Sequence, residues 1–116
     1  MTPDPALFPA MIERLPLADL PLPPETVEGR MLAAPEGLAV FFTFHRAVTL
    51  PAHSHGAQWG TVLAGSVTLT VEGETRTYRP GESYFIPAGA VHAAEVSAGS
   101  KVLDVFEEAD RYAPRR

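Results

Sequence analysis

Hydrophobic and polar residues alternate along short stretches of this chain, and strict alternation predicts β-strands with one buried face. The clearest stretch is residues 67–71, where valine and leucine alternate with threonine. A turn at 72–74 leads into a second strand at 75–78, which predicts a hairpin. Short strands at this spacing indicate an all-β sandwich or barrel. The remaining strands are expected at residues 27–33, 38–45, 83–86, 91–96 and 101–106.

The first 25 residues break this pattern because they are rich in proline. Seven of the twelve prolines lie here, so a long helix is excluded and only residues 10–15 suit a turn or two. Leucine is too frequent for a solvated tail. We therefore expect residues 1–25 to be an extension that packs on the barrel or on a second subunit. The barrel itself is expected at 26–110, and 111–116 are expected to be a frayed, solvent-exposed tail.

Size and charge restrict the class of protein. A chain of 116 residues forms one domain, and its net charge of -5 leaves no basic surface for nucleic acid. No apolar run is long enough to span a bilayer, and the start lacks the basic segment of a signal peptide. The chain has no cysteine, which removes disulfides and thiolate metal sites. These features predict a cytoplasmic protein without nucleic-acid or membrane partners.

Three of the four histidines fall in two short segments, around residues 53–55 and at residue 92. On a strand, the His53-Ser54-His55 spacing points both imidazoles the same way, since side chains alternate faces. A third imidazole, from His92 on a neighbouring strand, would provide half the coordination sphere of a divalent transition metal. The alternatives are a surface pair for the first two and a core histidine for His92. For His45 we expect ordinary packing or exposure.

These two segments resemble the two signature motifs of the cupin superfamily. The second motif reads Gly-x5-Pro-x-Gly-x2-His, and the first contains His-x-His followed by a glutamate and a glycine. The matching residues are His53, His55, Gly65, Gly81, Pro87, Gly89 and His92. The resemblance implies a small single-domain cupin, which is a double-stranded β-helix or jelly-roll barrel with the metal site inside.

The chain departs from the cupin pattern at four points. Ala47 replaces the first glycine, Val96 replaces the final asparagine, and the spacer after His55 is short. Most important, Gln58 stands where the family has a glutamate. A neutral amide leaves the ion its full charge, which favours anionic ligands. Gln58 either binds the metal weakly or hydrogen-bonds a bound water or substrate; the alternative is a buried amide bonded to the backbone.

The cupin resemblance implies a metal-binding protein but not one reaction, because the family includes oxygenases, isomerases, decarboxylases and lyases. We expect a metal-dependent enzyme acting on a small, anionic organic molecule, with iron, manganese, nickel, zinc, cobalt or copper. The alternative is a non-catalytic module that binds or senses a small molecule or a metal. No acid–base carboxylate has a place in the motifs, so the catalytic residues are unassigned. A homodimer is expected, since two-fold dimers are the commonest oligomers.

Two aromatic residues and three arginines are further candidates for the site. Trp59 and Tyr84 are expected to be core aromatics rather than pocket walls. Trp59 is adjacent to Gln58 on a strand and should therefore point to the opposite face. We expect the three arginines to lie on solvated strand faces and not to contact a substrate carboxylate. They are Arg30, Arg46 and Arg76.

Overall fold

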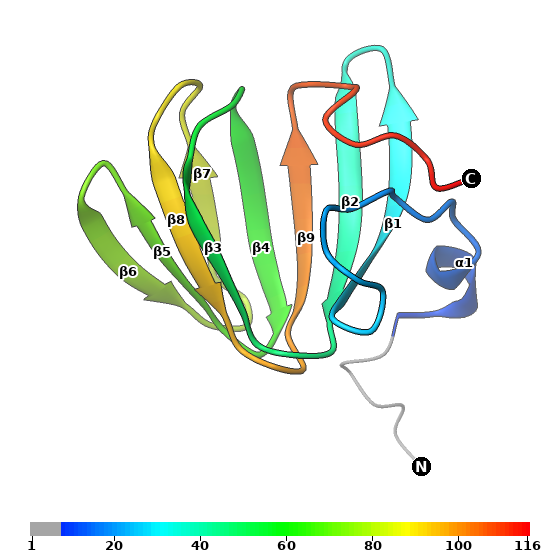
Figure 1. Ribbon diagram of the computed structural model, residues 1–116, viewed down its shortest axis with the longest axis horizontal. Coiled ribbons are helices and arrows are strands. Elements are labelled where there is room, and N and C mark those ends of the chain that lie inside the picture. Colours follow the sequence, from blue (N-terminus) through cyan, green and yellow to red (C-terminus); the bar gives the residue numbers. More distant parts are fainter. Residues whose placement is uncertain (1–7) are drawn as a thin grey trace.

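Two antiparallel sheets face each other in the computed structural model, which describes residues 8–116 (Figure 1). One sheet has the strand order β1-β2-β9-β4-β7 and the other the order β3-β8-β5-β6. This arrangement confirms the predicted all-β jelly-roll barrel. The elements are α1 (Ala10–Glu13), β1 (Val27–Ala34), β2 (Gly37–Phe44), β3 (Val48–His53), β4 (Gln58–Ala64), β5 (Val67–Val71), β6 (Glu74–Tyr78), β7 (Ser83–Ile86), β8 (His92–Val96) and β9 (Lys101–Phe106).

Strands β3 and β4 were not among those predicted from the alternation. Pro51 lies within β3, and a strand tolerates this proline because β3 is at the edge of its sheet. In β4 the large apolar side chains of Trp59 and Leu63 are exposed, while Gly60 and Val62 are buried. An alternation rule that places large apolar side chains inside therefore misreads this strand. Both strands matter for function, because they carry candidate site residues.

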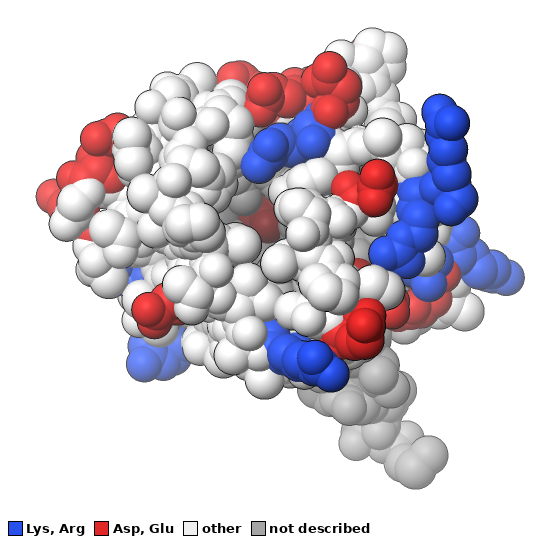
Figure 2. Space-filling model, in the orientation of Figure 1, with Lys and Arg blue, Asp and Glu red and all other residues white. Residues whose placement is uncertain are grey.

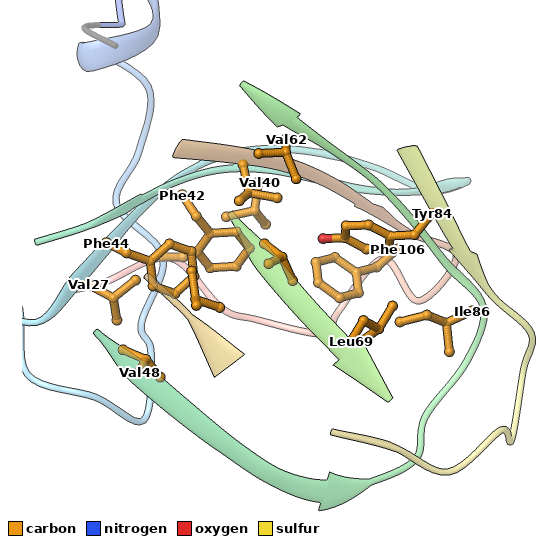
Figure 3. Close-up of a cluster of buried hydrophobic side chains, with 14 of the residues drawn as sticks. Val27, Val40, Phe42, Phe44, Val48, Val62, Leu69, Tyr84, Ile86 and Phe106 are labelled. Atoms are coloured by element: carbon orange, nitrogen blue, oxygen red, sulfur yellow. The ribbon is translucent and has the colours of Figure 1, made fainter. Parts of the chain in front are cut away.

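The core lies between the two sheets, and alternate residues of each strand point into it. Along β2 the pattern is regular, with Val40, Phe42 and Phe44 buried and the residues between them half-buried. Figure 3 shows these side chains converging with Leu69, Ile86 and Phe106 from other strands. Full burial of one such side chain stabilises the fold by about 1.5–3 kcal/mol. The same inward direction positions the polar residues described below.

The proline-rich segment runs along the free edge of β1. The amide of Met31 donates to the carbonyl of Pro16, and the amide of Ala18 donates to the carbonyl of Gly29. Ala18 is buried. An exposed strand edge invites pairing with other chains, so this contact protects the edge of the barrel. Residues 1–7 of the expected extension lie outside the described residues.

The C-terminal segment folds back onto the barrel: Arg111 and Tyr112 are half-buried, while residues 113–116 are exposed. The ring of Tyr112 lies edge-on to Phe106, with 5.7 Å between the ring centroids, and contacts Phe42 in the same way. The amide of Arg115 donates to Leu17. The packing of the Tyr112 ring therefore holds this segment against the barrel, although its charged residues had suggested a solvated end.

Within residues 8–116, no helix has the length and apolar character needed to cross a membrane.

Candidate metal centre and its cavity

A cavity of about 110 Å³ lies between the sheets. Figure 2 shows a hollow near the centre of the molecule, with acidic atoms visible inside it. Apolar side chains form most of the cavity wall, and segments near both ends of the chain contribute Leu20, Leu22 and Tyr112. The polar side chains of the wall include His53, His55, Gln58, His92, Asp104 and Arg111.

The three histidines of the two motifs come together at this cavity. His53 ends β3 and pairs with His92, the first residue of β8, while His55 lies just beyond β3. The ring centroids of His53 and His92 are 4.2 Å apart, and those of His55 and His92 are 4.8 Å apart. One nitrogen from each ring lies within 4.8 Å of the others. The group therefore has the spacing needed to hold one metal ion.

Backbone carbonyls define which ring nitrogen of each histidine is available. The Nδ1 atoms of His53, His55 and His92 lie 2.9, 2.8 and 3.0 Å from the carbonyl oxygens of Pro51, Gly56 and Ala90. A carbonyl can only accept, so each Nδ1 carries the proton and each Nε2 keeps its lone pair. This is the arrangement that a metal-binding histidine requires. The donor set therefore fits a divalent transition-metal ion.

The surroundings of the histidines favour the neutral, metal-binding form. Burial lowers the pKa of His55 and of His92 below the ordinary value, and the backbone hydrogen bonds partly oppose this effect. The positive charge of Arg111 lowers the pKa of both rings further. Since a protonated imidazole has no lone pair for a metal, both effects favour the protonation state that can bind a metal ion.

A carboxyl group that the sequence analysis did not identify lies in the same cavity. Asp104, on the inner face of β9, is 6% exposed and accepts a hydrogen bond of 2.6 Å from the Tyr84 hydroxyl. The signal in the sequence was a single aspartate at an inward position between Val102 and Phe106. Tyr84 was expected to be a core aromatic, and it is buried, but it also lines the cavity.

Burial raises the pKa of Asp104 to about 6, even though hydrogen bonds from Tyr84 and Gln58 favour its charged form. For Tyr84, burial and the nearby charge of Asp104 raise the pKa well above the ordinary value. Tyr84 therefore remains a hydrogen-bond donor at neutral pH. Asp104 is able to gain or lose a proton close to neutrality, which suits acid–base chemistry.

Gln58 begins β4 and lines the cavity, as do the histidines. Its side chain donates a hydrogen bond to the carboxyl group of Asp104. Trp59, the next residue, is 40% exposed, which agrees with the expectation that it faces away from the cavity. The structure thus connects Gln58 to the acidic group, and direct ligation of a metal by Gln58 stays a prediction.

Arg111 is the arginine that reaches the cavity, although the sequence analysis assigned it to a solvated tail. Its guanidinium carbon lies 5.0 Å from the centroid of the Tyr112 ring. Among residues 8–116, its buried Nε atom has no hydrogen-bond partner. The neighbouring aromatic residue thus anchors a cation beside the histidines, and no motif in the sequence indicated this position.

The other candidates lie elsewhere. His45 is exposed, with its Nε2 3.7 Å from Glu28. Arg46 is exposed, and Arg76 forms an exposed ion pair with Glu82. Arg30 is half-buried and donates to the carbonyl of Leu15. These residues are therefore separate from the histidine group.

Known proteins with similar sequence and structure place the barrel in a family. A profile described as "Cupin domain" matches residues 40–106. Mannose-1-phosphate guanylyltransferase ManC of Salmonella typhimurium is 38% identical over 55 residues, which are 47% of this chain and 11% of that protein. The chain thus aligns with about a tenth of the curated relatives it matches.

Two solved structures match most of the chain. The structure of KdgF from Halomonas sp. is 26% identical with a TM-score of 0.66, covering 85% of this chain and 86% of that one. An RmlC-like cupin from Shewanella frigidimarina is 25% identical with a TM-score of 0.73, covering 85% of this chain and 88% of that one. Because the profile match spans more than half of the sequence and the barrel agrees, this chain belongs to the cupin family.

Proposed function

We propose that this protein binds one divalent transition-metal ion and acts with it on a small, anionic organic molecule. The observation that carries the proposal is the orientation of the three imidazoles. Each Nδ1 donates to a backbone carbonyl, so all three Nε2 lone pairs are available to one ion. The residues that would hold it are His53, His55 and His92, with Gln58 as a further, neutral oxygen donor or as a partner of the bound substrate.

The ion that suits this site is a divalent cation of iron, manganese, nickel, zinc, cobalt or copper, all of which accept imidazole ligands. Such an ion acts as a Lewis acid that polarises an oxygen of the substrate. With neutral ligands alone, the ligands themselves do not offset the positive charge of the ion. This imbalance favours a substrate that brings its own negative charge.

Arg111 supports an anionic substrate independently of the metal. Its guanidinium group lines the cavity beside the histidines, and its charge lowers the pKa of both His55 and His92. A guanidinium group binds carboxylates with paired hydrogen bonds. The cavity is small and mostly apolar, so it suits a compact organic acid rather than a polymer.

Asp104 favours reactions in which a proton moves. Its carboxyl group is held by Tyr84 and Gln58 inside the cavity, and the raised pKa lets it exchange a proton near neutral pH. In such a reaction Asp104 takes a proton from a carbon next to a carbonyl group and returns it to another position. Of the reactions open to the family, isomerase, lyase and decarboxylase chemistry need such a group most directly.

Two measurements test the function. The first is the metal content of protein purified without an affinity tag, followed by calorimetric titration with Mn²⁺, Ni²⁺ and Zn²⁺. The second incubates the metal-loaded protein with pyruvate and 2-oxobutyrate in D₂O and follows the loss of the C3 proton signals by NMR. We expect exchange that is at least about 10-fold faster than with free metal, since a positioned base contributes about 100-fold or more.

Three variants sharpen these tests. Asp104→Asn should reduce exchange to background while metal still binds, and Arg111→Leu should weaken binding of the two acids by about 10–100-fold. Arg76→Leu is the matched control, because Arg76 is exposed. This variant should leave both the proton exchange and the binding of the two acids unchanged. Failure to bind any of the three metals would contradict the proposal. Tight binding of the acids without exchange would instead identify the alternative, a non-catalytic binding or sensing module.

A further inference from the structure

Strand pairing fixes two of the three histidines, while the third lies in a loop. His53 ends β3 and pairs with His92 at the start of β8. In both, Nδ1 lies next to a carbonyl oxygen two residues earlier in the chain. His55 lies between β3 and β4, and the carbonyl beside its Nδ1 belongs to the following residue, Gly56. The orientation of the His55 ring therefore depends on how this loop is held.

Two glutamates directly after β9 hold the loop, since β4 begins beside the end of β9 in the same sheet (Figure 1). The amide of Gly56 donates to Oε1 of Glu108 over 2.9 Å, and the amide of Ala57 donates to Oε1 of Glu107 over 2.8 Å. The backbone amide of Glu107 also donates to the carbonyl of Ala57 over 3.0 Å. Hydrogen bonds to a charged carboxylate are roughly twice as strong as those between neutral groups. We call these two side chains the glutamate clamp.

The glutamate clamp determines where the carbonyl of Gly56 points. In a planar trans peptide unit, the carbonyl and the amide point to opposite sides. The unit between Gly56 and the next residue has its amide on Glu107. Its carbonyl oxygen lies 2.8 Å from Nδ1 of His55. Glu107 therefore turns this carbonyl toward the imidazole, which keeps the proton on Nδ1 and the lone pair on Nε2.

The peptide unit before Gly56 is held in the same way. Its amide donates to Glu108. Its carbonyl, which belongs to His55, accepts from the amide of Gly89 over 2.9 Å. Both peptide units that follow His55 are thus fixed at each end, and in each of them one end is held by a glutamate side chain.

Gly56 gives the glutamate clamp its room. A Cβ atom on Gly56 would lie 2.9 Å from Oε1 of Glu107 and 2.9 Å from Cγ of Glu108. Gly56 and the residue after it also form the whole of the short spacer that departs from the cupin motif. The departure in the sequence therefore coincides with the residues that the clamp holds.

We propose that Glu107 and Glu108 are positioning residues, which hold the His55 imidazole in its metal-binding orientation without binding the ion or the substrate. The inference rests on the proposed function in one respect, because it takes His55 as a metal ligand. Both glutamates lie outside the cavity wall. Oε1 of Glu108 is 3.8 Å from Nδ1 of His55, but the Glu108 side chain is 41% exposed, so solvent screens its charge. The clamp therefore acts mainly through its hydrogen bonds.

The tautomer of His55 in the metal-free protein tests the clamp directly. In ¹⁵N-labelled protein at about pH 8, where imidazole is neutral, long-range ¹H–¹⁵N spectra distinguish the two tautomers of each ring. We expect wild-type His55 to carry its proton on Nδ1. Glu107→Ala and Glu108→Ala should each give a mixture of tautomers at His55, while His53 and His92 keep the wild-type pattern.

Calorimetric titration with Ni²⁺ and Zn²⁺ measures the effect on the metal site. Each alanine variant should bind these ions at least about 10-fold more weakly, as is usual when the partner of a metal-binding histidine is lost. Glu107→Gln and Glu108→Gln keep an oxygen that accepts from the same amide. Their affinities should stay within about 5-fold of the wild type, because only a solvent-screened charge is removed.

Glu82→Ala is the matched control. Glu82 also accepts from a backbone amide, that of Arg79 over 2.8 Å, but it does so in the turn before β7. This variant should change neither the His55 tautomer nor the metal affinity. If an alanine variant fails to fold, as judged by circular dichroism, Glu107→Asp and Glu108→Asp replace it. Their carboxylates keep the charge but end one methylene group short of the amides, so the same changes are expected.

Wild-type tautomers in both alanine variants, with metal affinities within about 2-fold of the wild type, would overturn the proposal. So would an equal effect of Glu82→Ala, which would show that the loss of any such carboxylate disturbs the site. If the wild type binds no metal, the proposed function fails, and the tautomer of His55 alone decides whether the clamp orients the ring.

Discussion

The hydroxyl of Tyr84 and the carboxyl group of Asp104 meet across a space that a glycine leaves open. Their oxygens are 2.6 Å apart, and Gly60 of β4 is paired in register with both residues. A methyl group on Gly60 would collide with the Tyr84 ring and hydroxyl and with the Asp104 carboxyl oxygen. The small residue in β4 is therefore what lets strands β7 and β9 bring an acid and its donor together.

Gly60→Ala should separate this pair and destabilise the protein by about 2–4 kcal/mol, through overpacking and a lost hydrogen bond to a buried group. Urea unfolding at one fixed protein concentration measures the effect. Tyr84→Phe removes the hydrogen bond without the collision and should cost less. If Gly60→Ala changes the free energy of unfolding by less than about 0.5 kcal/mol, the neighbouring side chains move aside and a glycine is not required at this position.

The raised pKa of Asp104 should contribute stability to the metal-free protein in acid, against the loss that the lowered pKa values of His55 and His92 cause there. The pKa of the Asp104 carboxyl group is about 6 in the folded state and its ordinary value is 3.8, so the folded state binds this proton more tightly. The contribution is complete below pH 3.8 and is lost as the pH rises to about 6, with a total of about 3 kcal/mol. Asp104→Asn should remove this part of the pH dependence.

Urea titrations of metal-free protein between pH 4 and pH 7 measure this dependence. Asp110→Asn is the control, because Asp110 is exposed and should leave the pH profile of the wild type intact. Identical profiles for wild type and Asp104→Asn would show that Asp104 is not the group that favours folding in acid.

His92→Ala should lose most of the metal affinity, at least about 100-fold, because two imidazoles alone form a weak site. His92 is 5% exposed, so its replacement could disturb the fold. The circular dichroism spectrum of the His92→Ala variant should therefore be compared with that of the wild type. His45→Ala is the matched control, since His45 is exposed beside Glu28 and away from the cavity. Equal losses in the two variants, by calorimetric titration, would argue against a site built on the motif histidines.

Gln58→Glu should bind the bare divalent ion more tightly, because a charged oxygen replaces a neutral one. It should bind small carboxylates more weakly, since the new charge repels them. Beside Asp104, a second carboxyl group should also raise the pKa of the first. Paired titrations of wild type and variant, with metal and then with acetate, measure both affinities. Unchanged affinities with a lowered melting temperature would mean that Gln58 has only a structural role.

Local sequence predicted strands and turns, while the resemblance of two short segments to the cupin motifs predicted the jelly-roll barrel and the histidine group. Alternation over 67–71, turn residues at 72–74 and 80–81, and the spacing of His53 and His55 each depend on the geometry of a single strand or turn, which neighbouring residues determine. The closeness of His92 to His53 depends instead on the pairing of β8 with β3. Local sequence could not predict the tautomers of the three histidines, because the carbonyl groups that accept from their Nδ1 atoms depend on the exact path of each loop.

Tertiary structure alone decided the rest of the site. Asp104 reaches Tyr84 and Gln58 because β9 inserts beside β4, which in turn pairs with β7, and the pairing of strands distant in sequence leaves no local trace. Arg111 enters the cavity because the Tyr112 ring packs on Phe106, which draws a charged terminus inward. The local pattern thus determined which residues can point inward, and long-range packing determined which of them meet.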